Sequence, residues 1–118
     1  MPDVELLFVY GTLKKGCGNH VYLEGSEYVG EGYAPGYTLR VFYVPYAVRA
    51  PPSCRVYGEL YRVPRLVLED VDDLEYPAGY VRVRARVVLS GGGEAEAWMY
   101  ADPEEEAAAC AAERYDCP

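Results

Sequence analysis

Glutamine is absent from this chain of 118 residues, and asparagine, histidine and tryptophan each occur once. Lysine is also scarce, because only two of the eleven basic residues are lysines and the rest are arginines. A shortage of heat-labile amides is typical of proteins from thermophiles. This scarcity makes Asn19 and His20 conspicuous, since both lie in one glycine-rich loop after the first apolar segment.

Long hydrophobic runs and clusters of positive charge are also missing. No segment approaches the roughly 18 apolar residues of a membrane span, and the first ten residues lack the basic start of a signal peptide. The net charge is −8, and the basic residues form no patch beyond Lys14 and Lys15. Such a chain repels phosphate backbones and anionic membranes. We therefore expect a cytoplasmic protein with neither a nucleic-acid nor a membrane partner, and we take a monomer as its expected state.

The four cysteines form no C-x-x-C pair, and one histidine does not complete a zinc site, so no metal is predicted. Disulfides stay open, and Cys17 with Cys54 is the first pairing to consider. Cys110 and Cys117 would lie about 10 Å apart along a continuous helix, which is too far for a bridge. Small buried thiols are the alternative.

The chain length fits one domain over residues 1–118. Alternation of apolar and polar residues predicts several strands, some of them bent at glycines and prolines. An opening proline and helical spacing of apolar residues predict a first helix, and Asp102 as the N-cap, Pro103 and an acidic first turn predict a second. The sequence thus predicts an α+β protein with strands over 4–10, 28–46 (turns at 34–36 and 45–46), 55–63 and a hairpin of 81–89 with 94–100, and with helices over 64–75 and 103–114.

Glu75 is the unusual carboxylate of the first predicted helix. At 100° per residue it falls among the apolar positions of the helix, whereas Asp72 flanks that stripe and is expected to be solvated. A carboxylate directed at a core is uncommon unless it is paired or used, and burial raises its pKa towards the range of a general base. The alternatives are a partner among the arginines of 81–89, or a helix that ends before Glu75.

The segment from Val4 to His20 is an apolar strand that breaks at Gly11 into a loop, which is a common position for a site. Asn19 could support a turn and His20 could be solvated there. Cys17 and His20 could instead be the nucleophile and base of a thiol hydrolase, an interpretation that lacks rigid support on this loop.

Three segments in this order, VYGTLKKGCGNH, GELYRV and VDDLEYPAGYVRV, resemble the γ-glutamylcyclotransferase-like family, especially its short γ-glutamylamine cyclotransferase and AIG2-like members. The resemblance implies a small mixed β-barrel with flanking helices. It also implies an enzyme that needs no cofactor and cleaves γ-glutamyl amides by attack of the substrate's own α-amino group, which releases 5-oxoproline and an amine. A protein of the same fold that binds an amino-acid-like ligand without turnover is the alternative.

The resemblance assigns roles to individual residues. Glu75 matches the family's catalytic glutamate, and the loop after the first strand matches its substrate-holding backbone. Two tyrosines match positions that line the family's cavity. The predicted substrate-binding residues are Tyr10, Gly11, Thr12, Leu13, Tyr80 and Tyr100.

Overall fold

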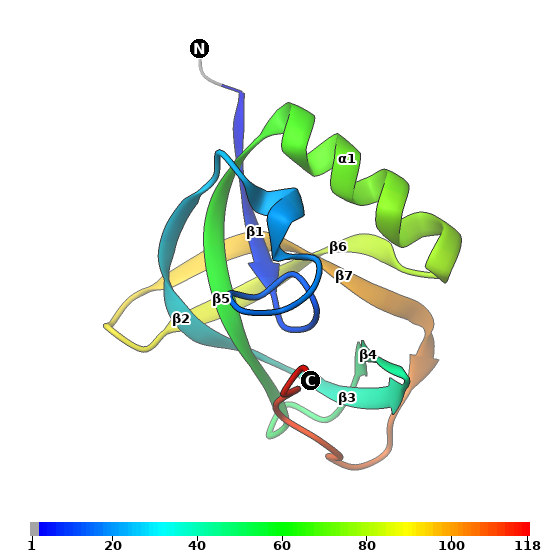
Figure 1. Ribbon diagram of the computed structural model, residues 1–118. Helices are drawn as coiled ribbons and strands as arrows, with labels where there is room; N and C mark the ends of the chain where they lie inside the picture. Colours follow the sequence, from blue (N-terminus) through cyan, green and yellow to red (C-terminus); the bar gives the residue numbers. More distant parts are fainter. Residues whose placement is uncertain (1–2) are drawn as a thin grey trace.

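The computed structural model describes residues 3–118, whose strands form one mixed sheet that closes on itself (Figure 1). The hairpin of β3 (Tyr37–Phe42) with β4 (Val44–Arg49) extends this sheet beyond β7 (Glu94–Glu106), which also pairs with β1 (Val4–Val9). The β1–β7 and β4–β7 pairs are parallel, whereas the other described pairs are antiparallel. The barrel order is β1 (Val4–Val9), β5 (Arg55–Pro64), β2 (Glu27–Pro35), β6 (Val81–Leu89) and β7 (Glu94–Glu106), which pairs back to β1, and the extension is β4 (Val44–Arg49) and β3 (Tyr37–Phe42). The predicted small mixed β-barrel is confirmed.

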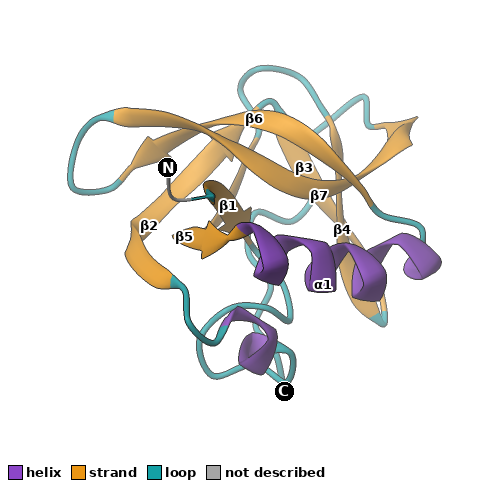
Figure 2. Ribbon diagram, turned by 90° about the horizontal axis from the view of Figure 1, so that it is seen from above, coloured by secondary structure: helices purple, strands orange, loops and turns teal. Residues whose placement is uncertain are grey.

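One α-helix, α1 (Arg65–Glu75), follows β5 directly and packs against one side of the barrel (Figure 2). Two short 3₁₀ segments, η1 (His20–Leu23) and η2 (Tyr76–Ala78), complete the helical structure of the described residues. Alternation along the strands separates two apolar clusters. One fills the barrel around Phe8 and Met99, and the other lies between the barrel wall and α1 around Leu7 and Val71. α1 is therefore held by its apolar stripe, as its sequence predicts.

Gly58 fixes how β1 ends. A Cβ atom at this position would lie 2.3 Å from the carbonyl oxygen of Val9 and 2.8 Å from Cζ of Phe8. Only glycine allows such a close approach of the β5 backbone to β1. The end of β1, where the chain turns into the glycine-rich loop, is thus pressed against β5.

The predicted hairpin of residues 81–89 with 94–100 forms, with the Arg82, Arg84 and Arg86 side chains on its outer face. The predicted turn at 45–46 is wrong. The chain reverses at Tyr43, which has a φ of 64°, and Pro45 lies buried within β4. Because Pro45 is buried beside the barrel rather than exposed at a turn, it becomes part of a pocket wall.

The second predicted helix, over 103–114, is also wrong, because β7 continues to Glu106 and the tail after it is irregular, with bends and one isolated bridge. The tail is tied down by a bridge between Leu39 and Ala112 and by a disulfide between Cys54 and Cys110. Its small, exposed alanines bury too little apolar surface to hold a helix against these ties. None of the helices within residues 3–118 has the length and apolar character of a membrane span.

Candidate active site

A pocket opens where β1 ends, between the first turn of the loop and the last turn of α1. The space between its atoms, including the open mouth, is about 330 Å³. All seven residues that the sequence predicts for the site lie around it, although they come from separate parts of the chain. The lining residues are Phe8, Val9, Tyr10, Gly11, Thr12, Leu13, Pro45, Glu75, Tyr80 and Tyr100.

Glu75 is the carboxylate of this pocket. It is the last residue of α1 and is only 9% exposed. Burial raises its pKa from the ordinary 4.5 to about 7, since the pocket wall is mostly apolar and ionisation there loses hydration. A carboxyl group with this pKa can both take and return a proton near neutral pH.

The arginines of β6 do not neutralise Glu75. Arg82 pairs with Asp72 at 2.9 Å, Arg84 with Glu96 at 3.2 Å and Arg86 with Glu94 at 2.5 Å. Among the hydrogen bonds and ion pairs of residues 3–118, none involves the Glu75 carboxylate. The helix also does not end before Glu75. Both alternative explanations of this residue are therefore excluded by the geometry.

Residues 11–13 line the pocket, and their backbone N–H groups are free. Within the described chain, the N–H groups of Gly11, Thr12 and Leu13 donate to no protein acceptor, although their carbonyl oxygens are all bonded. Successive free N–H groups in a turn form a binding site for an anion. A Cβ atom on Gly11 would lie 2.9 Å from Cγ of Pro45, so glycine is required where β4 crosses the loop.

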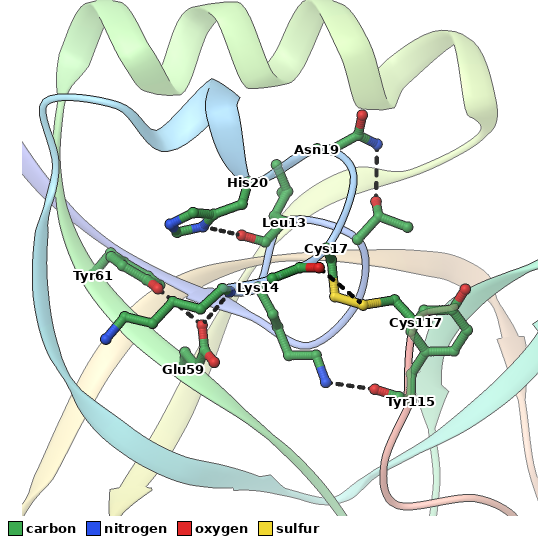
Figure 3. The surroundings of a disulfide bond; sticks show 12 residues. Leu13, Lys14, Cys17, Asn19, His20, Glu59, Tyr61, Tyr115 and Cys117 are labelled. Carbon is green, nitrogen blue, oxygen red and sulfur yellow. Dashed lines mark hydrogen bonds between the residues drawn. A yellow bond between two sulfur atoms is a disulfide. The ribbon is translucent and has the colours of Figure 1, made fainter.

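Asn19 and His20 shape this loop rather than enter the pocket (Figure 3). The backbone N–H of Asn19 donates to the carbonyl oxygen of Thr12 at 2.9 Å, and its Nδ2 donates to the Thr12 hydroxyl at 2.9 Å. Nδ1–H of His20 donates to the carbonyl oxygen of Leu13 at 2.9 Å. These bonds hold the carbonyl oxygens of Thr12 and Leu13, so they fix the loop in a conformation in which its N–H groups stay free.

The hydroxyl groups of the three lining tyrosines are engaged within the protein. Tyr10 donates to the carbonyl oxygen of Tyr100 at 2.5 Å and accepts from the N–H of Ala47 at 3.0 Å. Tyr80 donates to the carbonyl oxygen of Pro45 at 2.6 Å. Burial raises the pKa of all three tyrosines well above the ordinary value, so they remain neutral. They form the walls and fix β4 over the pocket.

All four cysteines form disulfides, which link Cys17 to Cys117 and Cys54 to Cys110. The pairing of Cys17 with Cys54 and the alternative of buried thiols are therefore both wrong. Figure 3 shows the first bridge joining the tail to the glycine-rich loop. Because its sulfur is bonded, Cys17 cannot act as a nucleophile, and the thiol hydrolase interpretation is excluded.

Asp72 is not the solvated carboxylate that its helical position predicts. Its Oδ1 accepts a hydrogen bond from the Tyr100 hydroxyl at 2.6 Å and pairs with Nε of Arg82 at 2.9 Å. Pro45, which lines the pocket, is a second residue whose place sequence reasoning missed. The spacing of Asp72, Tyr80 and Arg82 in one short motif was the available signal for the pairing of Asp72, whereas no local pattern indicated that Pro45 lines the pocket.

Residues 7–116 match the family described as gamma-glutamyl cyclotransferase, AIG2-like. This chain belongs to that family. A putative gamma-glutamylcyclotransferase from Methanocaldococcus jannaschii is 38% identical over 104 residues, which cover 86% of this chain and 87% of the relative. The human gamma-glutamylaminecyclotransferase is 38% identical over 95 residues, which cover 71% of this chain and 62% of the relative.

Solved structures of related proteins have the same fold as this AIG2-like family member. A Pyrococcus horikoshii protein superposes with a TM-score of 0.70 and 31% identity, over 88% of this chain and 82% of that one. An AIG2-like protein from mouse superposes with a TM-score of 0.74 and 28% identity, over 83% and 76% of the two chains. Membership of the family and the names of the relatives support an enzyme with a γ-glutamylcyclotransferase-like function.

Proposed function

We propose that this chain cleaves γ-glutamyl amides into 5-oxoproline and a free amine, with Glu75 as general acid and base and without a cofactor. The observation that carries the proposal is a buried, unpaired carboxylate that shares a narrow pocket with three free backbone N–H groups. A base and a set of anion donors are the two requirements of an intramolecular acyl transfer.

Glu75 serves the proton transfers of this reaction. The substrate's α-ammonium gives a proton to the carboxylate, and the resulting amine attacks the γ-carbonyl carbon. The carboxyl group then donates this proton to the leaving nitrogen as the amide C–N bond breaks. The regenerated carboxylate takes the surplus proton from the new ring nitrogen and passes it to the released amine, so that the neutral lactam of 5-oxoproline remains. A pKa of about 7 suits these steps at neutral pH, since the group is a competent base and a competent acid.

The loop at residues 11–13 supplies the donors. Its N–H groups would hold the substrate's α-carboxylate or the oxyanion that develops on the γ-carbonyl, because both are negatively charged oxygens. The tyrosine walls and Pro45 would restrict the substrate to the bent conformer in which its amine meets its γ-carbonyl. Such positioning can account for about 7–11 kcal/mol of the barrier in a well-oriented intramolecular reaction.

The test compares the parent with Glu75→Gln on a panel of γ-glutamyl amines that includes glutathione and ε-(γ-glutamyl)lysine, scored for 5-oxoproline. We expect the parent to release 5-oxoproline from at least one member, and Glu75→Gln to lose about 100- to 10,000-fold in kcat. The parent's kcat/KM should rise as the pH passes through about 7, because the free enzyme is active when Glu75 is ionised.

Asp73→Asn is the matched control, because it removes one exposed carboxylate from the same helix outside the pocket. Full 5-oxoproline release by a folded Glu75→Gln protein would refute the role of Glu75. Thermal stabilisation by a γ-glutamyl amine without any product would assign the chain to the alternative class of binding proteins. A single domain, a monomeric state and a cytoplasmic location stay predictions from the sequence.

A further inference from the structure

Asp72, Arg82 and Tyr100 form a connected polar group directly beside the pocket. Arg82 and Tyr100 lie opposite each other in the β6–β7 register, so their side chains share the sheet face that α1 covers. Asp72 lies above them on α1, where it accepts from the Tyr100 hydroxyl at 2.6 Å and pairs with Arg82 at 2.9 Å. This carboxylate is only 13% exposed, so the pair is largely withdrawn from water.

Glu75 follows Asp72 by three residues on the same helix. Residues at this spacing are neighbours on the helix surface, with Cβ atoms about 5–6 Å apart. Asp72 and Glu75 are therefore neighbouring carboxylates on α1, and among the ion pairs of residues 3–118 Arg82 contacts only Asp72. The guanidinium is also held at 4.7 Å over the ring of Trp98 and at 3.5 Å from the hydroxyl of Tyr76.

We propose that Asp72 is a positioning residue for Glu75: by holding the Arg82 guanidinium, it keeps that positive charge away from the Glu75 carboxylate. The Asp72–Arg82 pair neutralises itself, so Glu75 experiences the apolar pocket alone. Without Asp72 the guanidinium would be free to turn to the neighbouring carboxylate of Glu75. A salt-bridged Glu75 would be a weaker base and would hold its proton less well.

The groups that face Glu75 are few enough to make the effect specific. The buried tyrosines remain neutral over the range of the experiment, because burial raises the pKa of each. The charged groups to consider are then Asp72, Arg82 and Asp102, and Asp102 is the same in every variant compared. The titratable groups on this side are Tyr10 of β1, Tyr46 of β4, Tyr76 of η2, Tyr80 before β6, Arg82 of β6, Tyr100 and Asp102 of β7, and Asp72 of α1 itself.

The experiment follows the carboxyl carbon of Glu75 by NMR during a pH titration, with its signal assigned by comparison with Glu75→Gln. The parent should titrate near 7. Asp72→Asn should lower the midpoint by about one unit or more, the effect of a new adjacent cation on a carboxyl group. Asp72→Asn combined with Arg82→Gln should return it to the parent value. Asp73→Asn should leave it in place.

An unchanged midpoint in Asp72→Asn would overturn the proposal, and so would a lowered midpoint that persists in the double variant. Asp72→Ser is the second variant if Asp72→Asn does not fold, because its hydroxyl also cannot hold the guanidinium as an ion pair. It should lower the midpoint in the same way, and an unchanged midpoint in a folded Asp72→Ser protein would equally overturn the proposal.

This inference rests on the proposed function for its meaning, but the titration needs no turnover. If Asp72→Asn shifts the Glu75 midpoint in a protein that releases no 5-oxoproline, the positioning role stands and the proposed reaction fails. In an active protein, the acidic limb of the kcat/KM profile should move with the NMR midpoint. A purely structural role of Asp72 would lower the rate without moving that limb.

Discussion

The stability of a Glu75→Gln variant, measured relative to the parent, should increase as the pH rises from acidic to alkaline. The carboxyl group has a pKa of about 7 in the folded protein and an ordinary value of 4.5 in the unfolded chain. Below 4.5 it is protonated in both states and does not affect the balance. Between 4.5 and 7 only the unfolded chain ionises, so the parent's free energy of unfolding falls as the pH rises.

The size of the effect follows from the difference between the two pKa values. Ionisation of Glu75 favours the unfolded parent by about 1 kcal/mol at pH 5 and about 3 kcal/mol at pH 8. A glutamine does not ionise, so the stability of the variant relative to the parent should increase by about 2 kcal/mol between these pH values. Any constant difference in packing between the two side chains cancels in this comparison.

Urea unfolding of both proteins at pH 5, 6, 7 and 8, with the disulfides intact, measures this change directly. Asp73→Asn controls for the loss of one negative charge from α1, because its side chain is exposed. A stability difference between Glu75→Gln and the parent that stays constant over this range would refute the reasoning. It would mean that Glu75 is hydrated in the folded protein, which also removes the basis for its role as a base.

Two further predictions concern the loop after β1. Gly11→Ala should lower kcat/KM about 10- to 100-fold in a folded protein, because its Cβ would lie 2.9 Å from Cγ of Pro45 and displace the N–H groups of the loop. Gly18→Ala is the control, because its Cβ would meet nothing within 4 Å, and it should leave kcat/KM unchanged. Equal activity of the two variants in the 5-oxoproline assay would contradict this. Replacing Cys17 and Cys117 together by serine should lower the free energy of unfolding by about 4 kcal/mol in urea, since their bridge closes a long loop. A stability equal to the parent's would mean that the bridge does not contribute.

Patterns of near neighbours predicted α1 and the burial of Glu75 correctly. The apolar positions of residues 65–75 recur at helical spacing, and the packing of α1 on the barrel reinforces the preference of the segment itself. The same arithmetic places Glu75 in the buried stripe because a helix has a fixed geometry. Only the pattern of one segment is needed for either result.

Contacts between distant segments explain the errors. The segment after Asp102 has the capping and composition of a helix, but β7 takes up its first residues, and a bridge to β3 and a disulfide at Cys110 hold the rest in an irregular conformation. The partner of Asp72 lies on a strand that the helical wheel does not contain, so its pairing with Arg82 could not be derived from the wheel. Pro45 is placed at the pocket by the β4–β7 pairing and by the hydrogen bonds of Tyr10 and Tyr80 to β4, which no local pattern specifies.

The bridge between Cys17 and Cys117 turns most of the chain into a covalent ring. The ring contains α1 and every strand except β1, which lies outside it on the N-terminal side of Cys17. A protease that cuts once inside the ring cannot release a fragment until the bridge is reduced. The ring also closes on the loop that carries the pocket's N–H donors, so the tail cannot peel away from the barrel without pulling on that loop.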